Sequence, residues 1–283
     1  MMEASPTLPR TMEPMSRAWR RRAAAATALV VVTAAVGISI GLLRTQPRPT
    51  ISTCSVPSAP GTAPVTLSPE QAQNAAIITA VGVRRGMPDH AVTVALATAL
   101  QESHLLNLPY GDRDSRGLFQ QRPSQGWGTA TQVLDPVYAA GAFYDHLVLV
   151  SGWESLPVTE AAQMVQGSAT PDAYAHWEPE ARSLAIATTG ERPAALACQL
   201  SGFGGAPPAA GALAAAAVAQ LGPHALATPT SAKQGWQFAA WAVAHAYNYH
   251  LTSVSYAGSQ WTWNSAATTW SPAPVSTGVV TTT

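Results

Sequence analysis

The sequence predicts a mainly α-helical, α+β domain that follows a single N-terminal transmembrane helix and carries a small α/β module at its C-terminal end. Three observations predict this class. Apolar residues recur at helical spacing through much of residues 67–190. A run of 21 residues, Ala23 to Leu43, contains no charge. A Trp-rich helical pattern over residues 235–250 precedes two short strand patterns.

The uncharged run has the length of one membrane-spanning helix. More basic residues precede it than follow it closely: Arg17, Arg20, Arg21 and Arg22 against Arg44 and Arg48. We therefore expect residues 1–22 to be a cytoplasmic tail, residues 23–43 to anchor the chain in the cell membrane, and the main domain to be extracytoplasmic. A cleavable signal peptide, which would give a secreted protein, is the alternative. The run is longer than the core of a signal peptide, and no clear Ala-x-Ala site follows it.

Composition divides the rest of the chain. Residues 44–66 are rich in Pro, Ser and Thr and residues 191–230 in Ala, Pro and Gly, so both are expected to be linkers. Between them we expect a domain of residues 67–190, and after them a C-terminal module of residues 231–283.

Two helices open the predicted domain. Ser68, Pro69 and Gln71 form a capping box at the start of the first, which Gly86 ends. The second covers about residues 91–103 and is apolar on nearly every side, as expected for a helix in the middle of a domain. The later elements are expected in this order: a small hairpin within Leu105 to Gly117, helices from Asp135, from Thr159 to about Ser168, over about 173–188, between Ala209 and Leu221 and over Gly235 to His250, and strands Ser253 to Tyr256 and Gln260 to Trp263.

Glu102 lies where the second helix calls for an apolar residue. It continues the stripe of Ala91, Val94, Ala95 and Thr98 one turn later. Because burial and the negative end of the helix dipole both disfavour a carboxylate, the side chain is expected to hold a proton, as a general acid must. The alternative is an exposed carboxylate at a frayed helix end.

The residues after Glu102 carry a resemblance. A helix ending in Glu102-Ser103, followed some fifteen residues later by Gly117-Leu118-Phe119-Gln120, resembles the soluble lytic transglycosylases and goose-type lysozymes. The longer segments GLFQQRPSQGWG (117–128) and AAQMVQGS (161–168) resemble the transglycosylase-like domains of actinobacterial cell-wall proteins and their phages. The resemblance covers under half of the chain and implies a lysozyme-like fold with a cleft between helical lobes.

The activity implied by this resemblance is cleavage of the β-1,4 bond between N-acetylmuramic acid and N-acetylglucosamine in peptidoglycan. Glu102 would protonate the glycosidic oxygen and then, as a carboxylate, activate the nucleophile of the second step. That nucleophile is the sugar's own C6 hydroxyl in a lytic transglycosylase, which we favour, and water in a lysozyme. The implied partners are peptidoglycan glycan strands and, through residues 23–43, the cytoplasmic membrane.

Further site residues are implied by matching the family's motifs. Ser103 should hold Glu102 or the substrate. Gln120, with Gln121 beside it, should hydrogen-bond the sugar N-acetyl group or the intermediate. Three aromatic residues are candidates for stacking on sugar faces, with core packing as the alternative: Tyr110, Trp127 and Tyr174.

The sequence departs from the family in one place. The Ala-Tyr-Asn-x-Gly motif is missing, and Val165-Gln166-Gly167-Ser168 stands at its approximate position, so Gln166 or Tyr174 would have to replace its tyrosine. A second catalytic carboxylate, which many glycosidases use, has the candidates Asp112, Asp114 and Glu154. The family manages without one, and Asp112 and Asp114 fit turn capping better.

Two other functions are open. The first is a non-catalytic binding or scaffolding protein, in which the lysozyme-like cleft only binds peptidoglycan. A transport-associated membrane protein is the weaker alternative, because one span without an intramembrane charge encloses no pathway.

The charge pattern gives no sign of nucleic-acid binding. Charged residues make up 11% of the chain, the net charge is zero, and there is no basic stripe.

Two cysteines, Cys54 and Cys198, flank the predicted domain. In an extracytoplasmic setting such a pair is more often bonded than free, so we expect a disulfide that joins the ends of the domain. The alternative is two unpaired thiols. We expect no metal and no cofactor, because two distant cysteines and scattered histidines offer no ligand spacing.

Overall fold

The computed structural model describes residues 51–61, 63–167, 172–225, 228–264, 269–274 and 278–283. Residues from Arg48 to Thr283 form one compact unit. The tail and membrane anchor expected over residues 1–22 and 23–43 lie outside the described residues. None of the described helices is long and apolar enough to cross a membrane.

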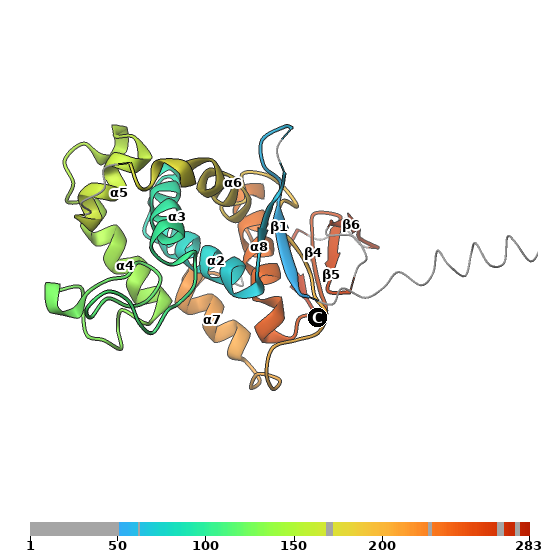
Figure 1. Cartoon of the computed structure of the whole chain (residues 1–283). Coiled ribbons are helices and arrows are strands. Elements are labelled where there is room, and N and C mark those ends of the chain that lie inside the picture. The colour runs from blue at the N-terminus through green and yellow to red at the C-terminus, as the bar shows by residue number, and fades with distance from the viewer. Residues whose placement is uncertain (1–50, 62, 168–171, 226–227, 265–268, 275–277) are drawn as a thin grey trace, which may run out of the picture. The chain divides into compact units, whose positions relative to one another are not determined.

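The compact unit is rich in helices and mixes them with two small antiparallel sheets (Figure 1). Its α-helices are α2 (Pro69–Arg84), α3 (Asp89–Ser103), α4 (Pro136–Leu147), α5 (Val158–Gln166), α6 (Glu178–Thr188), α7 (Ala212–Leu221) and α8 (Ala232–Tyr249). Short 3-10 helices are η1 (Pro123–Gln125), η2 (Trp153–Ser155) and η3 (Ala175–Trp177). Its strands are β1 (Thr53–Val56), β2 (Val65–Leu67), β3 (Ala197–Gln199), β4 (Ser253–Tyr256), β5 (Ser259–Thr262), β6 (Ser271–Pro272) and β7 (Thr281–Thr282).

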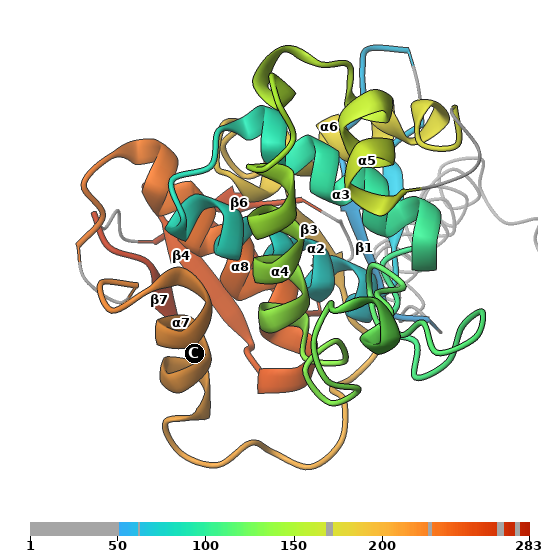
Figure 2. The ribbon, with the colours of Figure 1, turned by 90° about the vertical axis from the view of Figure 1, so that its left-hand side faces the viewer.

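Helix α3 is enclosed by neighbouring helices (Figure 2). Every residue from Ala91 to Leu100 is buried, and α2, α4, α5 and α6 all pack against the helix. This is the environment that its nearly all-apolar sequence predicted. A helix enclosed in this way can reach solvent only at its ends, and Glu102 lies at one of them.

Local sequence signals set the helix starts. The Ser68 hydroxyl accepts a hydrogen bond from the Gln71 amide at 3.2 Å, and the Gln71 side chain accepts one from the Ser68 amide at 2.8 Å, so the predicted capping box is confirmed. Asp135 caps α4 by accepting from the amides of Val137 and Tyr138. The hairpin expected within residues 105–117 is reduced to one β-bridge, between Arg116 and Gln121.

The first sheet, in the order β2-β1-β3, joins distant parts of the chain. Cys54 of β1 lies directly opposite Cys198 of β3, and a disulfide links them, as the sequence predicted. The expected linker of residues 44–66 contains β1 and most of β2, and the expected linker of residues 191–230 contains β3 as well as α7, the helix expected between Ala209 and Leu221. The strands were not expected there, because composition alone does not show pairing between segments so far apart.

The C-terminal residues pack against the rest of the unit. Helix α8 contacts α2 and α6 and supports the second sheet, in the order β6-β5-β4-β7. The Lys233 ammonium group lies 2.7 Å from an Asp89 carboxylate oxygen at the start of α3. Trp236, Trp241 and Trp261 are buried, so these rings form part of the core.

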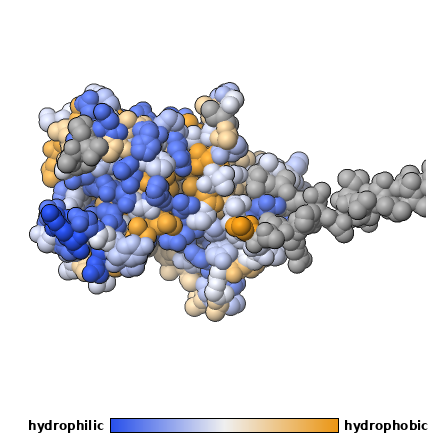
Figure 3. All heavy atoms as spheres, viewed as in Figure 1, coloured by the Kyte–Doolittle hydropathy of each residue, from blue (hydrophilic) through white to orange (hydrophobic). Residues whose placement is uncertain are grey.

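The surface is polar where Figure 3 shows it. Hydrophilic side chains cover most of that face, and hydrophobic ones form small separate areas. Isolated apolar side chains are normal on a folded protein, so this face gives no sign of a large docking patch.

The disulfide should contribute strongly to stability. It closes a loop with a sequence separation of 144 residues, so the loop-entropy model predicts that it stabilises the fold by about 4 to 5 kcal/mol. Replacing both cysteines by serine in a protein of residues 48–283 should lower the free energy of unfolding by about that amount, measured by urea denaturation. The double variant should be insensitive to reductant, whereas the parent should lose stability when reduced. A parent that is equally stable with and without reductant would contradict this prediction.

Candidate active site

The carboxylate of Glu102 meets an aromatic hydroxyl group. Glu102 is half-buried on the last turn of α3, and the Tyr174 hydroxyl donates a hydrogen bond to its Oε1 at 2.8 Å. Tyr174 is only 1% exposed, so its ring is held by the core and not free to move. The structure therefore brings together Glu102 and one of the three aromatic residues singled out from the sequence.

Ser103 fastens the Gly-Leu-Phe-Gln segment to α3. Its buried hydroxyl lies 2.7 Å from the Leu118 carbonyl and 3.1 Å from the Ala99 carbonyl, one turn earlier in α3. Gln166 of α5 holds the same segment from another side, because its Nε2 donates to the Phe119 carbonyl at 2.8 Å. Both residues thus position the backbone beside Glu102.

A second aromatic side chain contacts the end of α3. Trp177 of η3 donates from Nε1 to Gln101 Oε1 at 2.9 Å, and its ring lies edge-on to that of His104 with the centroids 5.2 Å apart. Together with the bond between Tyr174 and Glu102, these contacts join residues 174–177 to the last turn of α3. The sequence reasoning missed Gln101 and Trp177. A Trp three residues after Tyr174 was the one signal available.

Gln120 is used within its own loop. Its backbone has φ 47°, a conformation uncommon for a residue other than glycine. The side-chain Nε2 donates to the carbonyls of Tyr110 and Gly117, and Oε1 accepts from the Ser115 hydroxyl at 3.0 Å. The residue therefore shapes the loop beside Glu102, while the contact with a sugar implied by the resemblance stays a prediction.

The predicted role of Gln121 is corrected. This side chain is 1% exposed, and its Nε2 donates to the Ala139 carbonyl of α4 at 3.0 Å. A group that is buried against α4 cannot contact a substrate in this conformation. Of two adjacent glutamines, only one can follow the loop surface while the other points inward.

The other two aromatic candidates lie in different surroundings. Tyr110 is 68% exposed in the loop after α3, and its backbone carbonyl accepts from Gln120. Trp127 is partly buried and stacks on His146 of α4 with the ring centroids 3.9 Å apart. Tyr110 thus keeps an accessible ring, whereas part of the surface of Trp127 is taken up by α4.

The candidate second carboxylates have structural or exposed positions. Asp114 accepts from the Ser124 amide at 2.7 Å and from Arg122 Nε at 3.0 Å. The backbone hydrogen bond from Ser124 is the main cause that lowers the pKa of Asp114 to about 2. Asp112 is 91% exposed, and Glu154 is exposed on η2. The turn-capping interpretation of Asp114 is thereby supported, and Glu102 is left as the carboxylate that a tyrosine hydroxyl contacts.

One further carboxyl group near α3 has a shifted titration. Glu180, in the first turn of α6, is half-buried, and burial raises its pKa while the nearby charge of His104 opposes the shift. The sequence did not single it out, because Glu178 and Glu180 both look like ordinary acidic residues at a helix start.

No Ala-Tyr-Asn sequence directly follows α5. An Ala246-Tyr247-Asn248 sequence does occur, but it lies on α8, where Asn248 donates to Gln73 of α2. Tyr174 contacts Glu102 instead, and Gln166 contacts the Phe119 carbonyl.

The chemistry available at this site is proton transfer. Glu102 is an acid or base with a fixed orientation, and the described part of the chain contains no group of three His, Cys, Asp or Glu residues that could hold a metal ion.

Compared with known proteins, the chain matches no protein-family model and no curated protein.

Asp114 should make stability depend on pH. Its folded pKa of about 2 lies below the ordinary value of 3.8, so its contribution is fully present above about pH 4 and is lost as the pH falls toward 2. Asp114→Asn should therefore destabilise the protein at pH 6 and reduce the loss of stability between pH 4 and pH 2. The measurement is the thermal unfolding temperature at each pH. Asp112→Asn, at an exposed carboxylate, is the matched control and should leave both unchanged. Equal curves for the parent and Asp114→Asn would refute the assignment.

Gly117 should not tolerate a side chain. It has φ 78°, and an added Cβ would lie 2.1 Å from the Val133 carbonyl oxygen. Gly126 has a similar φ of 85° but open space around it. Gly126→Ala should cost about 1 to 2 kcal/mol from backbone strain alone, and Gly117→Ala clearly more, measured by urea denaturation. Equal losses would show that the contact with Val133 relaxes freely.

Proposed function

We propose that this protein is a membrane-anchored, extracytoplasmic peptidoglycan glycosidase with a lysozyme-like domain and Glu102 as its general acid and base. A lytic transglycosylase is the form we favour. The observation that carries the proposal is the hydrogen bond from Tyr174 to Glu102 at the end of a buried helix. The motifs that carry the family resemblance did not specify this contact, so it supports the proposal independently of them.

Glu102 combines a hydrogen-bond partner with an accessible side. As a carboxylate it accepts the Tyr174 hydroxyl, while its half-buried position leaves one side open to solvent and substrate. In the proposed first step, protonated Glu102 donates its proton to the glycosidic oxygen as the bond to the sugar breaks. The resulting carboxylate is then stabilised by the tyrosine hydroxyl.

The second step uses the same carboxylate as a base. In a transglycosylase it accepts the proton of the C6 hydroxyl, whose oxygen bonds to C1 and gives a 1,6-anhydro product. Asp114 is engaged by Arg122 and Ser124, so it is not assigned as a second catalytic carboxylate. A single carboxyl group serves both steps when the nucleophile is part of the substrate, because no water then has to be held by a second carboxylate.

Glu102→Gln should abolish cleavage, and Tyr174→Phe should reduce kcat. A hydrogen bond to a charged group contributes about 1.5 to 3 kcal/mol. If the Tyr174 hydroxyl stabilises the transition state by this amount, its removal lowers kcat by about tenfold to a hundredfold. The measurement is mass spectrometry of muropeptides after incubating each protein with purified peptidoglycan. Anhydro-muramyl products identify a lytic transglycosylase, and reducing-end products identify a lysozyme.

Tyr144→Phe is the matched control for Tyr174→Phe. It removes a buried tyrosine hydroxyl, which donates to the Ile78 carbonyl at 3.1 Å, and its partner lies in α2, away from Glu102. It should lower stability and leave kcat unchanged. Binding to peptidoglycan without product from the parent would reject catalysis and leave a binding protein. Cleavage that persists in Glu102→Gln would reject Glu102 as the acid.

A further inference from the structure

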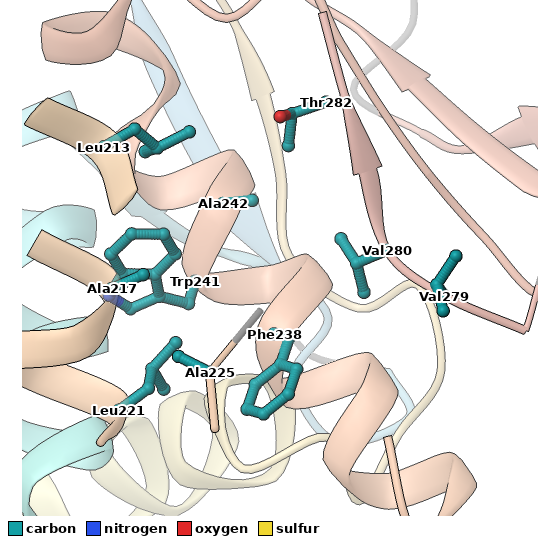
Figure 4. A pocket seen from close by; sticks show the side chains of 10 residues that line it. All are labelled: Leu213, Ala217, Leu221, Ala225, Phe238, Trp241, Ala242, Val279, Val280 and Thr282. Carbon is teal, nitrogen blue, oxygen red and sulfur yellow. The ribbon is translucent and has the colours of Figure 1, made fainter. Parts of the chain in front are cut away.

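A cavity of about 170 Å³ lies between α7, α8 and the C-terminal strand. Figure 4 shows residues of α7 facing residues of α8, with the C-terminal strand on a third side. Buried side chains, among them Ala217, Phe238, Trp241 and Ala242, form its floor. Its mouth includes the half-buried Leu213 and the exposed Val279.

The side chains that line the cavity are almost all apolar. Nine of the ten lining residues are apolar, the tenth is a threonine, and none is ionisable. The one indole nitrogen on the floor is already used, because Trp241 Nε1 donates to Gln220 Oε1 at 2.7 Å. A charged group placed here would lose its hydration and meet no lining side chain of opposite charge.

Helix α7 extends the apolar surface beyond the cavity. Its sequence, ALAAAAVAQL, has no charged residue, and its single polar side chain, Gln220, is buried against Trp241. Val218 on the same helix is 46% exposed. Surface helices normally carry a polar outer face, so α7 is unusual in continuing the apolar lining outward to solvent.

Small side chains create the space. Ala217 of α7 and Ala242 of α8 stand where larger residues would close the gap between the two helices. An apolar cavity of about 150 Å³ holds a ring of six carbons and stays free of water, so a cavity of this size accommodates an alkyl segment of similar length. A longer chain would continue through the mouth along exposed apolar surface.

We propose that this cavity binds the alkyl chain of an amphiphile, with the chain end against Trp241 and Ala242 and the polar head outside the mouth. The source is a free fatty acid or the acyl chain of a membrane lipid, which share this chemistry. None of the lining residues is a candidate for the peptidoglycan chemistry at Glu102. The two proposals can therefore fail independently.

Photocrosslinking of the full chain in lipid nanodiscs tests the site. One arm uses a free fatty acid with a diazirine near its methyl end, and the other uses a phospholipid whose acyl chain carries the same group. Mass spectrometry of peptides then locates the label. We expect label in peptides of α7, α8 or residues 278–283. Label from the fatty acid alone identifies a free amphiphile, and label from both probes identifies a lipid chain.

Two variants fill the cavity from different elements, Ala242→Leu from α8 and Val280→Phe from the strand side. Each should reduce labelling of these peptides by at least about tenfold, the effect of about 1.4 kcal/mol in binding. Ala215→Leu, on the exposed side of α7, is the matched control and should label like the parent. Circular dichroism establishes that each variant is folded. Absence of label in these peptides, or equal labelling of a folded filled variant, overturns the proposal.

Discussion

Burial of α3 on all sides is the constraint on which the rest of the structure depends. Because α2, α4, α5 and α6 enclose this helix, a charged side chain is tolerated only at its ends. The chain leaves the helix through two successive residues with positive φ, His104 at 53° and Leu105 at 61°. Neither is a glycine, so this exit is strained.

Helix α2 holds that strained exit in place. Asn74 donates to the Leu105 carbonyl and Gln71 to the His104 carbonyl, each at 2.8 Å. Gln71 is also the second half of the capping box that starts α2. One side chain therefore links the start of α2 to the end of α3, and the position of Glu102 is determined by both helices. Strained backbone beside a carboxylate is a common property of functional sites.

The sequence predicted the helices better than the side-chain partners. Ser68, Asp135 and the apolar run of α3 act through neighbouring residues, so local patterns were enough to place α2, α3 and α4. Glu102 could be singled out because it interrupts an apolar stripe. Its bond with Tyr174 spans 72 residues, and no local rule specifies such a contact. The inward turn of Gln121 and the pairing of β1 with β3 depend on tertiary structure in the same way.

The C-terminal residues belong to the same folding unit as the candidate active site. Lys233 pairs with Asp89 at the start of α3, and the disulfide holds β3, which packs on α8, beside β1. Since α8 also packs against α2, and α2 supports the exit from α3, the C-terminal helix stabilises the helix that fixes Glu102. A division into a catalytic domain and an independent module would separate these contacts. Helix α8 therefore supports the candidate site through packing.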